Sequence, residues 1–215
     1  MKQQDENLIF EYWKKFVNTT SAPVKDWLEK ENEFLKNNLQ KNSIVLDVGI
    51  GYGRNLESIH NICKKIVGID KAEYILDELK DVAKRYHNVE FFCEDARKMH
   101  FRDNLFDFVI CMGNTFGDFT ENKLNILKEM KRVCKLNGKI FVSVYSENAL
   151  NFRIEEYERK GIKISKIHNG EIFTEDGLKL EQFNKKMLNK IFKDAGLKVE
   201  IIKLNQISYM CVAKK

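Results

Sequence analysis

The stretch Ser43–Asn55, SIVLDVGIGYGRN, decides the fold of this chain of 215 residues. It opens with an apolar run, Ile44–Leu46, that suits a strand buried in a parallel sheet, and the run ends in an acid, Asp47. Three glycines then follow at alternate positions: Gly49, Gly51 and Gly53. Because residues without a side chain let the backbone turn tightly and approach a ligand, the stretch predicts a binding loop at a strand end.

Strand and helix patterns alternate after this loop. Strands are expected at 66–70, 89–93, 106–112 and 139–145, and helices at 56–63, 75–86 and 124–133. Asn137-Gly138 is expected to stop the last of these helices. Two further strands, 197–204 and 206–213, have so short a link that they must run antiparallel. The pattern predicts an α/β fold, because successive β/α units build a mostly parallel sheet with helices on both faces.

The chain is expected to form a single domain with four segments. These are a helical segment at 1–42, a ligand-binding core at 43–145, an insertion at 146–183, and a closing helix and strand pair at 184–215. The helices expected from about Gln4 to Phe16 and from about Val24 to Leu39 either close over the glycine loop as a lid or pack into the core. The insertion is charged and contains Asn169-Gly170, which is typical of a hairpin turn. We interpret it as a substrate cover.

Composition excludes several classes of protein. The net charge is +5 and the pI is near 8.8, but the lysine pairs are dispersed among acids, which is typical of a solvated surface rather than a nucleic-acid face. The five cysteines include no CxxC pair, so neither a metal site nor a disulfide framework is expected. No apolar run is long enough to span a bilayer, and the first residues lack an apolar signal core. We therefore expect a cytoplasmic protein without a membrane partner.

Two classes of ligand fit a glycine-rich loop after the first strand of such a sheet. A dinucleotide fingerprint requires G-x-G-x-x-G, and Arg54 occupies the position of its third glycine. Asp47 precedes the first glycine by two residues, and a carboxylate there repels a pyrophosphate but attracts the ammonium group of an amino-acid-like ligand. The residues therefore favour a ligand with an amino-acid part.

The run VLDVGIGYG resembles motif I of the class I S-adenosylmethionine-dependent methyltransferases, an apolar run and an acid followed by GxGxG. The resemblance extends over about 44–145 and implies a Rossmann-like sheet of seven strands, the last one antiparallel. It also implies that Asp70 binds the ribose hydroxyls, that Lys71 packs on adenine, and that Asp95 accepts from the adenine amino group. The implied residues for S-adenosyl-L-methionine, without a metal ion, are Asp47, Gly49, Gly51, Gly53, Asn55, Asp70, Lys71, Asp95, Ala96, Met112 and Gly113.

The segment MGNTFG at 112–117 resembles the Gly-Asn-Ser/Thr-Phe segment of glycine, sarcosine and related small-molecule N-methyltransferases. By this resemblance Asn114 orients the substrate, and the alternative is a turn residue that tolerates a left-handed backbone. Tyr145 at a strand end and Tyr12 on the possible lid are the other candidate catalytic residues, with packing as their alternative. Pro23 is the only proline, so the Pro-containing motifs of exocyclic-amine and cytosine C5 methyltransferases are absent.

The function expected from this resemblance is methyl transfer from S-adenosylmethionine to a nitrogen, or in second place an oxygen, of a small-molecule acceptor. Such a transfer is an in-line displacement, in which the main task is to position the lone pair of the acceptor. Two alternatives stay open: methylation of an RNA or a protein, which the basic pI supports, and a non-catalytic S-adenosylmethionine-binding subunit. No pattern in the chain specifies an oligomeric state.

Overall fold

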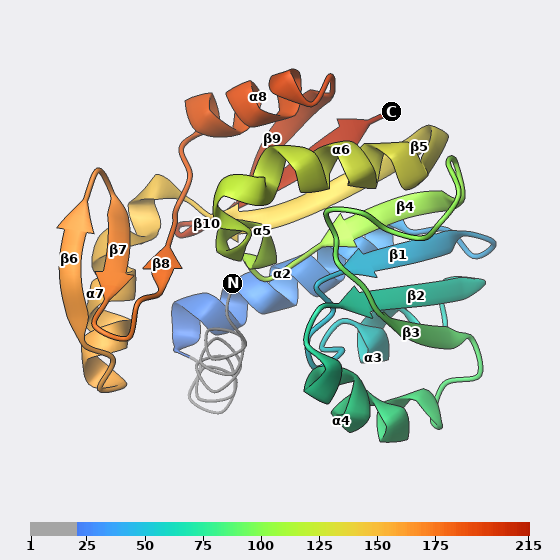
Figure 1. Cartoon of the computed structure of the whole chain (residues 1–215), viewed down its shortest axis with the longest axis horizontal. Helices are drawn as coiled ribbons and strands as arrows, with labels where there is room; N and C mark the ends of the chain where they lie inside the picture. The colour runs from blue at the N-terminus through green and yellow to red at the C-terminus, as the bar shows by residue number, and fades with distance from the viewer. Residues whose placement is uncertain (1–20) are drawn as a thin grey trace.

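The apolar run forms β1 (Ile44–Val48) of a seven-stranded sheet in the computed structural model, which describes residues 21–215 (Figure 1). The strand order is β3-β2-β1-β4-β5-β10-β9. The other strands are β2 (Lys65–Asp70), β3 (Val89–Cys93), β4 (Phe106–Cys111), β5 (Cys134–Tyr145), β9 (Lys198–Asn205) and β10 (Ser208–Lys214). Neighbours from β3 to β5 are parallel, whereas β10 is antiparallel to both β5 and β9. The predicted mostly parallel sheet with an antiparallel last strand is confirmed.

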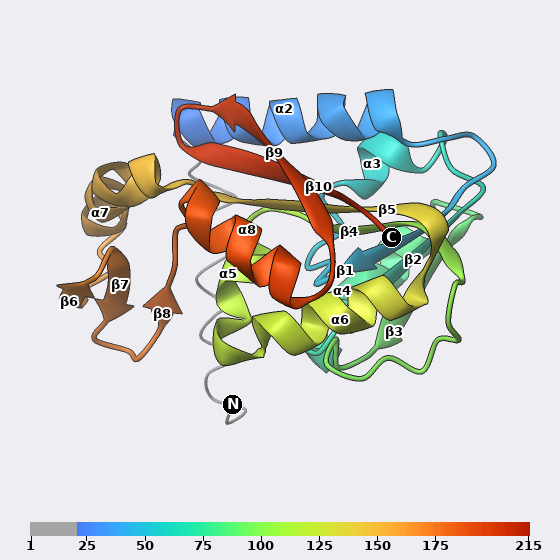
Figure 2. The ribbon, with the colours of Figure 1, turned by 90° about the horizontal axis from the view of Figure 1, so that it is seen from above.

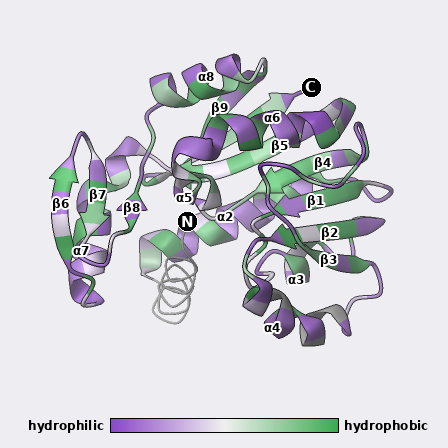
Figure 3. Ribbon diagram, viewed as in Figure 1, coloured by the Kyte–Doolittle hydropathy of each residue, from purple (hydrophilic) through white to green (hydrophobic). Residues whose placement is uncertain are grey.

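Helices cover both faces of this sheet (Figure 2). On one face an apolar cluster joins the strands to α2 (Ala22–Asn38), α3 (Leu56–Ile59) and α4 (Glu73–Ala83). On the other face a second cluster joins them to α6 (Lys123–Val133) and α8 (Lys185–Asp194). Colouring by hydropathy shows apolar strands between helices that carry polar residues (Figure 3). Each helix therefore buries one face against the sheet.

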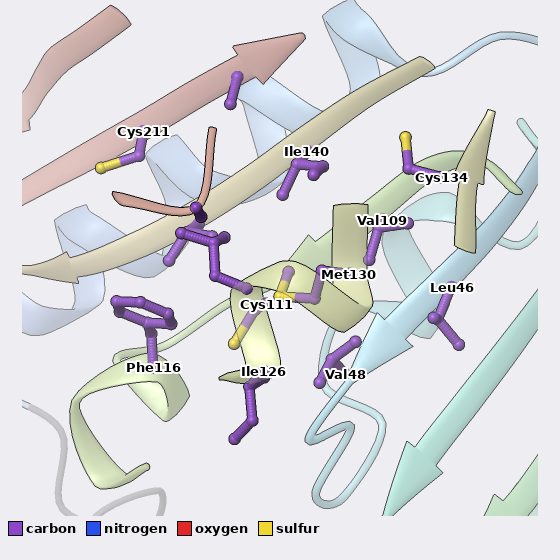
Figure 4. Close-up of a cluster of buried hydrophobic side chains, with 14 of the residues drawn as sticks. Leu46, Val48, Val109, Cys111, Phe116, Ile126, Met130, Cys134, Ile140 and Cys211 are labelled. Carbon is purple, nitrogen blue, oxygen red and sulfur yellow. The ribbon is translucent and has the colours of Figure 1, made fainter. Parts of the chain in front are cut away.

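The cluster under α6 is built from successive strands (Figure 4). Leu46 and Val48 of β1 contribute to it, whereas Val45 belongs to the cluster on the opposite face, as the two-residue period of a strand requires. Cysteines pack here as small hydrophobes, among them Cys111, Cys134 and Cys211. None of the five cysteines, all of which lie between residues 21 and 215, forms a disulfide.

The helix after the glycine loop is shorter than the sequence pattern predicts. α3 ends at Ile59 instead of continuing to residue 63. The side-chain amide of Asn88 donates to the carbonyl of His60 at 2.7 Å and to that of Cys63 at 3.0 Å. This side chain supplies donors to two carbonyls beyond the end of α3, which the helix itself does not bond.

The expected helix stop at Asn137-Gly138 is wrong. α6 ends at Val133, and β5 already begins at Cys134. Asn137 has a left-handed φ of 66°, and the pairing of β4 with β5 shifts register across this stretch. The Asn-Gly pair therefore makes an irregularity inside a long strand, because the strand partner and not the local turn signal sets the helix end.

The insertion at 146–183 forms a small layer beside the main sheet (Figure 1). It contains η2 (Glu147–Ala149), α7 (Leu150–Arg159) and a three-stranded sheet of β6 (Ile164–His168), β7 (Glu171–Thr174) and β8 (Lys179–Leu180). Asn169 and Gly170 have φ values of 51° and 79°, which confirms the predicted hairpin turn. A third apolar cluster joins this layer to Trp27 and Tyr145. The insertion thus packs at the end of β5, while its role as a substrate cover stays a prediction.

The second expected helix is confirmed as α2, with Pro23 in its first turn. It packs against α3 and β9, and its first turns bring Val24 and Trp27 to the third cluster. Closure of α2 as a lid stays a prediction. The helix expected from Gln4 to Phe16, and with it Tyr12, lies outside the described residues. Between residues 21 and 215, no helix combines the length and apolar composition needed to cross a bilayer.

Candidate active site

A cavity of about 840 Å³ opens at the carboxyl ends of β1 to β5. Eleven of the residues singled out from the sequence line it: Asp47, Gly49, Gly51, Asn55, Asp70, Lys71, Asp95, Ala96, Met112, Gly113 and Tyr145. Gly53 and Asn114 are not part of its wall. The strand ends therefore bring the predicted cofactor residues to one place, although they are spread over almost 100 residues of sequence.

The glycine loop needs the conformational freedom that the sequence suggests. Gly49, Gly51 and Gly53 have φ values of 70°, 52° and 70°, which residues with a side chain adopt only at a cost. The N–H groups of Gly49 and Ile50 both donate to the carbonyl of Ile69, at 2.9 and 3.0 Å. The loop is thereby held against the end of β2, where Asp70 follows.

Gly49→Ala is expected to lower the free energy of unfolding by about 2–5 kcal/mol, because a left-handed alanine costs about 1–2 kcal/mol and overpacking about 1–3 kcal/mol. A Cβ atom on Gly49 would lie 2.2 Å from Cγ2 of Thr115, whereas one on Gly51 would meet no heavy atom within 4 Å. Gly51→Ala is therefore the matched control, with only the backbone cost. Urea denaturation measures both, and Thr115→Ser should restore part of the loss in the Gly49 variant. Equal losses for the two alanines would contradict the steric account.

Asp70 links the glycine loop to the end of β2. Its Oδ2 accepts the N–H of Gly51 at 3.1 Å, and its Oδ1 accepts the N–H of Ala72 at 3.1 Å. A carboxylate keeps acceptor capacity after two such bonds, since each oxygen has two lone pairs. Asp70 therefore holds the loop at the end of β2, while its contact with ribose hydroxyls stays a prediction.

Asp95 lies after β3 at the other end of the cavity. It accepts from the backbone N–H of Arg97 at 2.9 Å and from its side-chain Nε at 3.0 and 2.9 Å. These bonds lower the pKa of the Asp95 carboxyl below its usual value. The group is therefore an ionised acceptor, as a contact with an amino group requires.

Asp47 is the most perturbed carboxyl of the site. It is 2% exposed, and this burial raises its pKa to about 7, although Arg54 and a hydrogen bond from Asn55 act in the opposite direction. Asn55 also lines the cavity, and its side chain forms a hydrogen bond with the Asp47 carboxyl. A cationic ligand group would favour the ionised form of Asp47.

Sequence reasoning missed Glu31, a carboxylate of α2 that is fully buried. Its Oε1 accepts the N–H of Gly113 at 3.1 Å and the hydroxyl of Ser143, and its Oε2 lies 2.5 Å from Nη2 of Arg54. The available signal was an acid within an apolar helical stripe, since Val24, Trp27, Glu31 and Leu35 are the buried residues of α2. Such an acid needs partners inside the fold.

Asn114 is a left-handed turn residue in this structure. Its φ is 68°, it is 1% exposed, and it precedes the short helix α5 (Thr115–Asp118). Its Oδ1 accepts the backbone N–H of Tyr145 at 3.0 Å. The side chain therefore ties the end of β4 to the end of β5, and a direct contact with substrate stays a prediction.

Tyr145 is the last residue of β5 and lines the cavity at the end of that strand. The Trp27 ring lies 4.6 Å away, and the Arg153 guanidinium lies 4.4 Å from the centre of the tyrosine ring. Burial raises the pKa of the Tyr145 hydroxyl well above its usual value. Tyr145 is therefore a neutral group at physiological pH and is unsuited to act as a base.

The comparisons with known proteins agree with this geometry. A family model described as a methyltransferase domain matches residues 45–138. A probable ribosomal RNA small subunit methyltransferase A of Methanococcus aeolicus is 33% identical over 73 residues, which span 34% of this chain and 27% of that protein. The match with that relative therefore covers only about a quarter of its length.

Two solved structures resemble the whole chain. A protein from Pyrococcus horikoshii OT3 superposes with a TM-score of 0.73 at 26% identity, over 95% of this chain and 98% of that one. The Burkholderia thailandensis 1,6-didemethyltoxoflavin-N1-methyltransferase, solved with 1,6-didemethyltoxoflavin and S-adenosylhomocysteine, has a TM-score of 0.73 at 14% identity. That match covers 99% of this chain and 86% of that one, and it shows a common fold.

The matched segment contains the glycine loop, Asp70 and Asp95, which meet at one cavity with the acidic residue of motif I. Together with the strand order, these findings support S-adenosylmethionine as the cofactor. Residues 45–138 thus match a methyltransferase domain, and the chain as a whole has the fold of solved S-adenosylmethionine-dependent methyltransferases.

Proposed function

We propose that this enzyme transfers the methyl group of S-adenosylmethionine to a nitrogen, or in second place an oxygen, of a small-molecule acceptor. The observation that carries this proposal is that the cavity continues past the cofactor residues. Beyond Gly113 it is lined by Trp27 of α2, Phe119 and Tyr145. We assign these side chains to the acceptor, because they line the cavity together with Met112 and Gly113 and are not among the predicted cofactor residues.

The reaction requires little acid–base chemistry from the chain. The acceptor atom forms a bond to the methyl carbon while the bond between carbon and sulfur breaks, and the sulfur keeps the electron pair as S-adenosylhomocysteine. The proton that the acceptor loses passes to water. An amine that has lost its proton already presents its lone pair, so alignment on the axis of the breaking bond supplies most of the catalysis.

Two observations support a small acceptor over a nucleic acid. A cavity of about 840 Å³ that must also hold the cofactor is of the size that small-molecule sites have, about 300–1,000 Å³. The insertion beside it carries eight acids and six bases, whereas binding to phosphates requires an excess of Lys and Arg. In the same fold, the Burkholderia thailandensis enzyme is named for methylation of a nitrogen on a small molecule.

Methylation of RNA is the second candidate function. The similarity to the ribosomal RNA methyltransferase and the basic pI favour it. That similarity covers a third of this chain, so it supports the cofactor more than the acceptor.

A screen with methyl-labelled S-adenosylmethionine separates the two. We expect label to pass to members of a panel of small amines, with weaker transfer to hydroxyl compounds and none to total RNA. Mass spectrometry of the product then locates the methyl group. Transfer to RNA that falls steeply with added salt would contradict the small-molecule proposal and support the second candidate.

A further inference from the structure

Arg54 has a buried group that the fold leaves unsatisfied. Its Nη2 pairs with Glu31 at 2.5 Å, but its Nη1 is buried and has no hydrogen-bond partner among the described residues. Arg54 also lines the cavity, next to Asp47 and Gly113. A guanidinium nitrogen removed from water without an acceptor is costly, which marks a place where an acceptor is missing.

Glu31 fixes the position of this guanidinium. One oxygen of its carboxylate holds Arg54, and the other accepts from Gly113 and Ser143. Three separate segments of the site are therefore bonded to a single buried side chain of α2. Arg54 cannot swing out to water without breaking its bond to Glu31.

The charges at this end of the cavity have the arrangement of a zwitterion receptor. Asp47 presents a carboxyl, and Arg54 presents a cation close enough to act on Asp47. The amino-acid end of the cofactor carries an ammonium group and a carboxylate on one carbon atom. If the ammonium group of the ligand lies toward Asp47, the carboxylate of the ligand can pair with the guanidinium of Arg54.

We propose that Arg54, held by Glu31, binds the carboxylate of the amino-acid end of S-adenosylmethionine, and that Glu31 is its positioning residue. The pair forms the carboxylate subsite. This inference concerns the cofactor alone, so it stands whichever acceptor is methylated and its test needs no turnover. It also gives a function to Arg54, which occupies the position of the third glycine of the dinucleotide fingerprint.

The test compares two ligands by calorimetry. S-adenosylhomocysteine has both charged groups, and S-adenosyl-3-thiopropylamine keeps the ammonium group but lacks the carboxylate. We expect the wild type to prefer the first by about tenfold or more, which is the scale of a charge-assisted hydrogen bond. Arg54→Met should remove this preference by weakening only the first ligand, and Arg54→Lys should keep part of it. The exposed Arg85→Met is the matched control and should change neither affinity.

Positioning by Glu31 is tested in the same way. Glu31→Gln should reduce the preference for the carboxylate, whereas Glu33→Gln, on an exposed position of the same helix, should not. The double variant Arg54→Met with Glu31→Gln leaves no unpaired buried charge and serves if the single variant fails to fold. Binding of 5′-methylthioadenosine, which lacks the amino-acid part, shows that the adenosine end is intact in each variant. Equal weakening of both charged ligands by Arg54→Met, or no effect on either, would overturn the proposal.

Discussion

Asp70→Ala is expected to weaken the binding of S-adenosylhomocysteine by about 100-fold, which corresponds to about 2.7 kcal/mol. The carboxylate accepts from the N–H groups of Gly51 and Ala72, and in the predicted complex it also accepts from ribose hydroxyls. Hydrogen bonds to a charged group contribute about 1.5–3 kcal/mol each, so loss of the ribose contacts together with looser positioning of the loop reaches this magnitude. Isothermal titration calorimetry measures the change directly.

Two companion variants make this result specific. Asp77→Ala removes an acid of α4 whose ion pair with Lys80 is largely exposed, so it should leave the affinity within about twofold of wild type. Asp70→Asn keeps the shape of the side chain but not its charge, and we expect an intermediate loss. Unchanged affinity in Asp70→Ala would refute the ribose contact.

Asp47→Asn is expected to change how stability depends on pH. The folded pKa of about 7 is raised above the unfolded value of 3.8 by burial, so the native state holds a proton that the unfolded chain has lost. The free energy of unfolding therefore falls as pH rises from about 4 to about 7, and is level above that range. Between pH 5 and pH 8 this fall amounts to about 3 kcal/mol, at about 1.4 kcal/mol for each pH unit.

The amide variant removes this titration, so the difference in slope between the two proteins isolates Asp47 from every other group. Urea denaturation of the ligand-free proteins at pH 5 and pH 8 measures it. Identical slopes for wild type and Asp47→Asn would contradict the raised pKa.

The same carboxyl should make cofactor binding depend on pH. A cationic ammonium group favours ionised Asp47, so affinity for S-adenosylhomocysteine in the wild type should rise as pH approaches 7. It should fall again at alkaline pH, where the α-amino group of the ligand loses its proton. Asp47→Asn should bind more weakly than wild type near pH 7 and should lose the rise below pH 7, so the two proteins converge at lower pH.

Much of this site follows from local sequence. An apolar run ending in an acid and three glycines specify a strand followed by a tight loop, because both depend on backbone sterics within a few residues. Asp70 at the end of β2 and Asp95 after β3 lie at the same edge of the sheet, because the carboxyl ends of parallel strands meet there. The hairpin at Asn169-Gly170 is equally local.

Other features depend on partners that are distant in sequence. The turn signal at Asn137-Gly138 predicted the wrong helix end, because pairing with β4 draws the chain into β5 earlier. Asn114 matches a motif by sequence, yet only the packed β5 shows that its side chain bonds to Tyr145 instead of lining the cavity. Tertiary bonding overrides the local signal in both places.

The sequence by itself determined the α/β class, the cofactor loop and the acids that meet around it, because these are set by short-range periodicity and by where strands end. Only the tertiary structure decided that Glu31 of α2 joins Arg54, Gly113 and Ser143. The last two lie 82 and 112 residues away along the chain. The physical reason is that a buried charge must find complementary groups wherever packing brings them, and no local pattern encodes which ones.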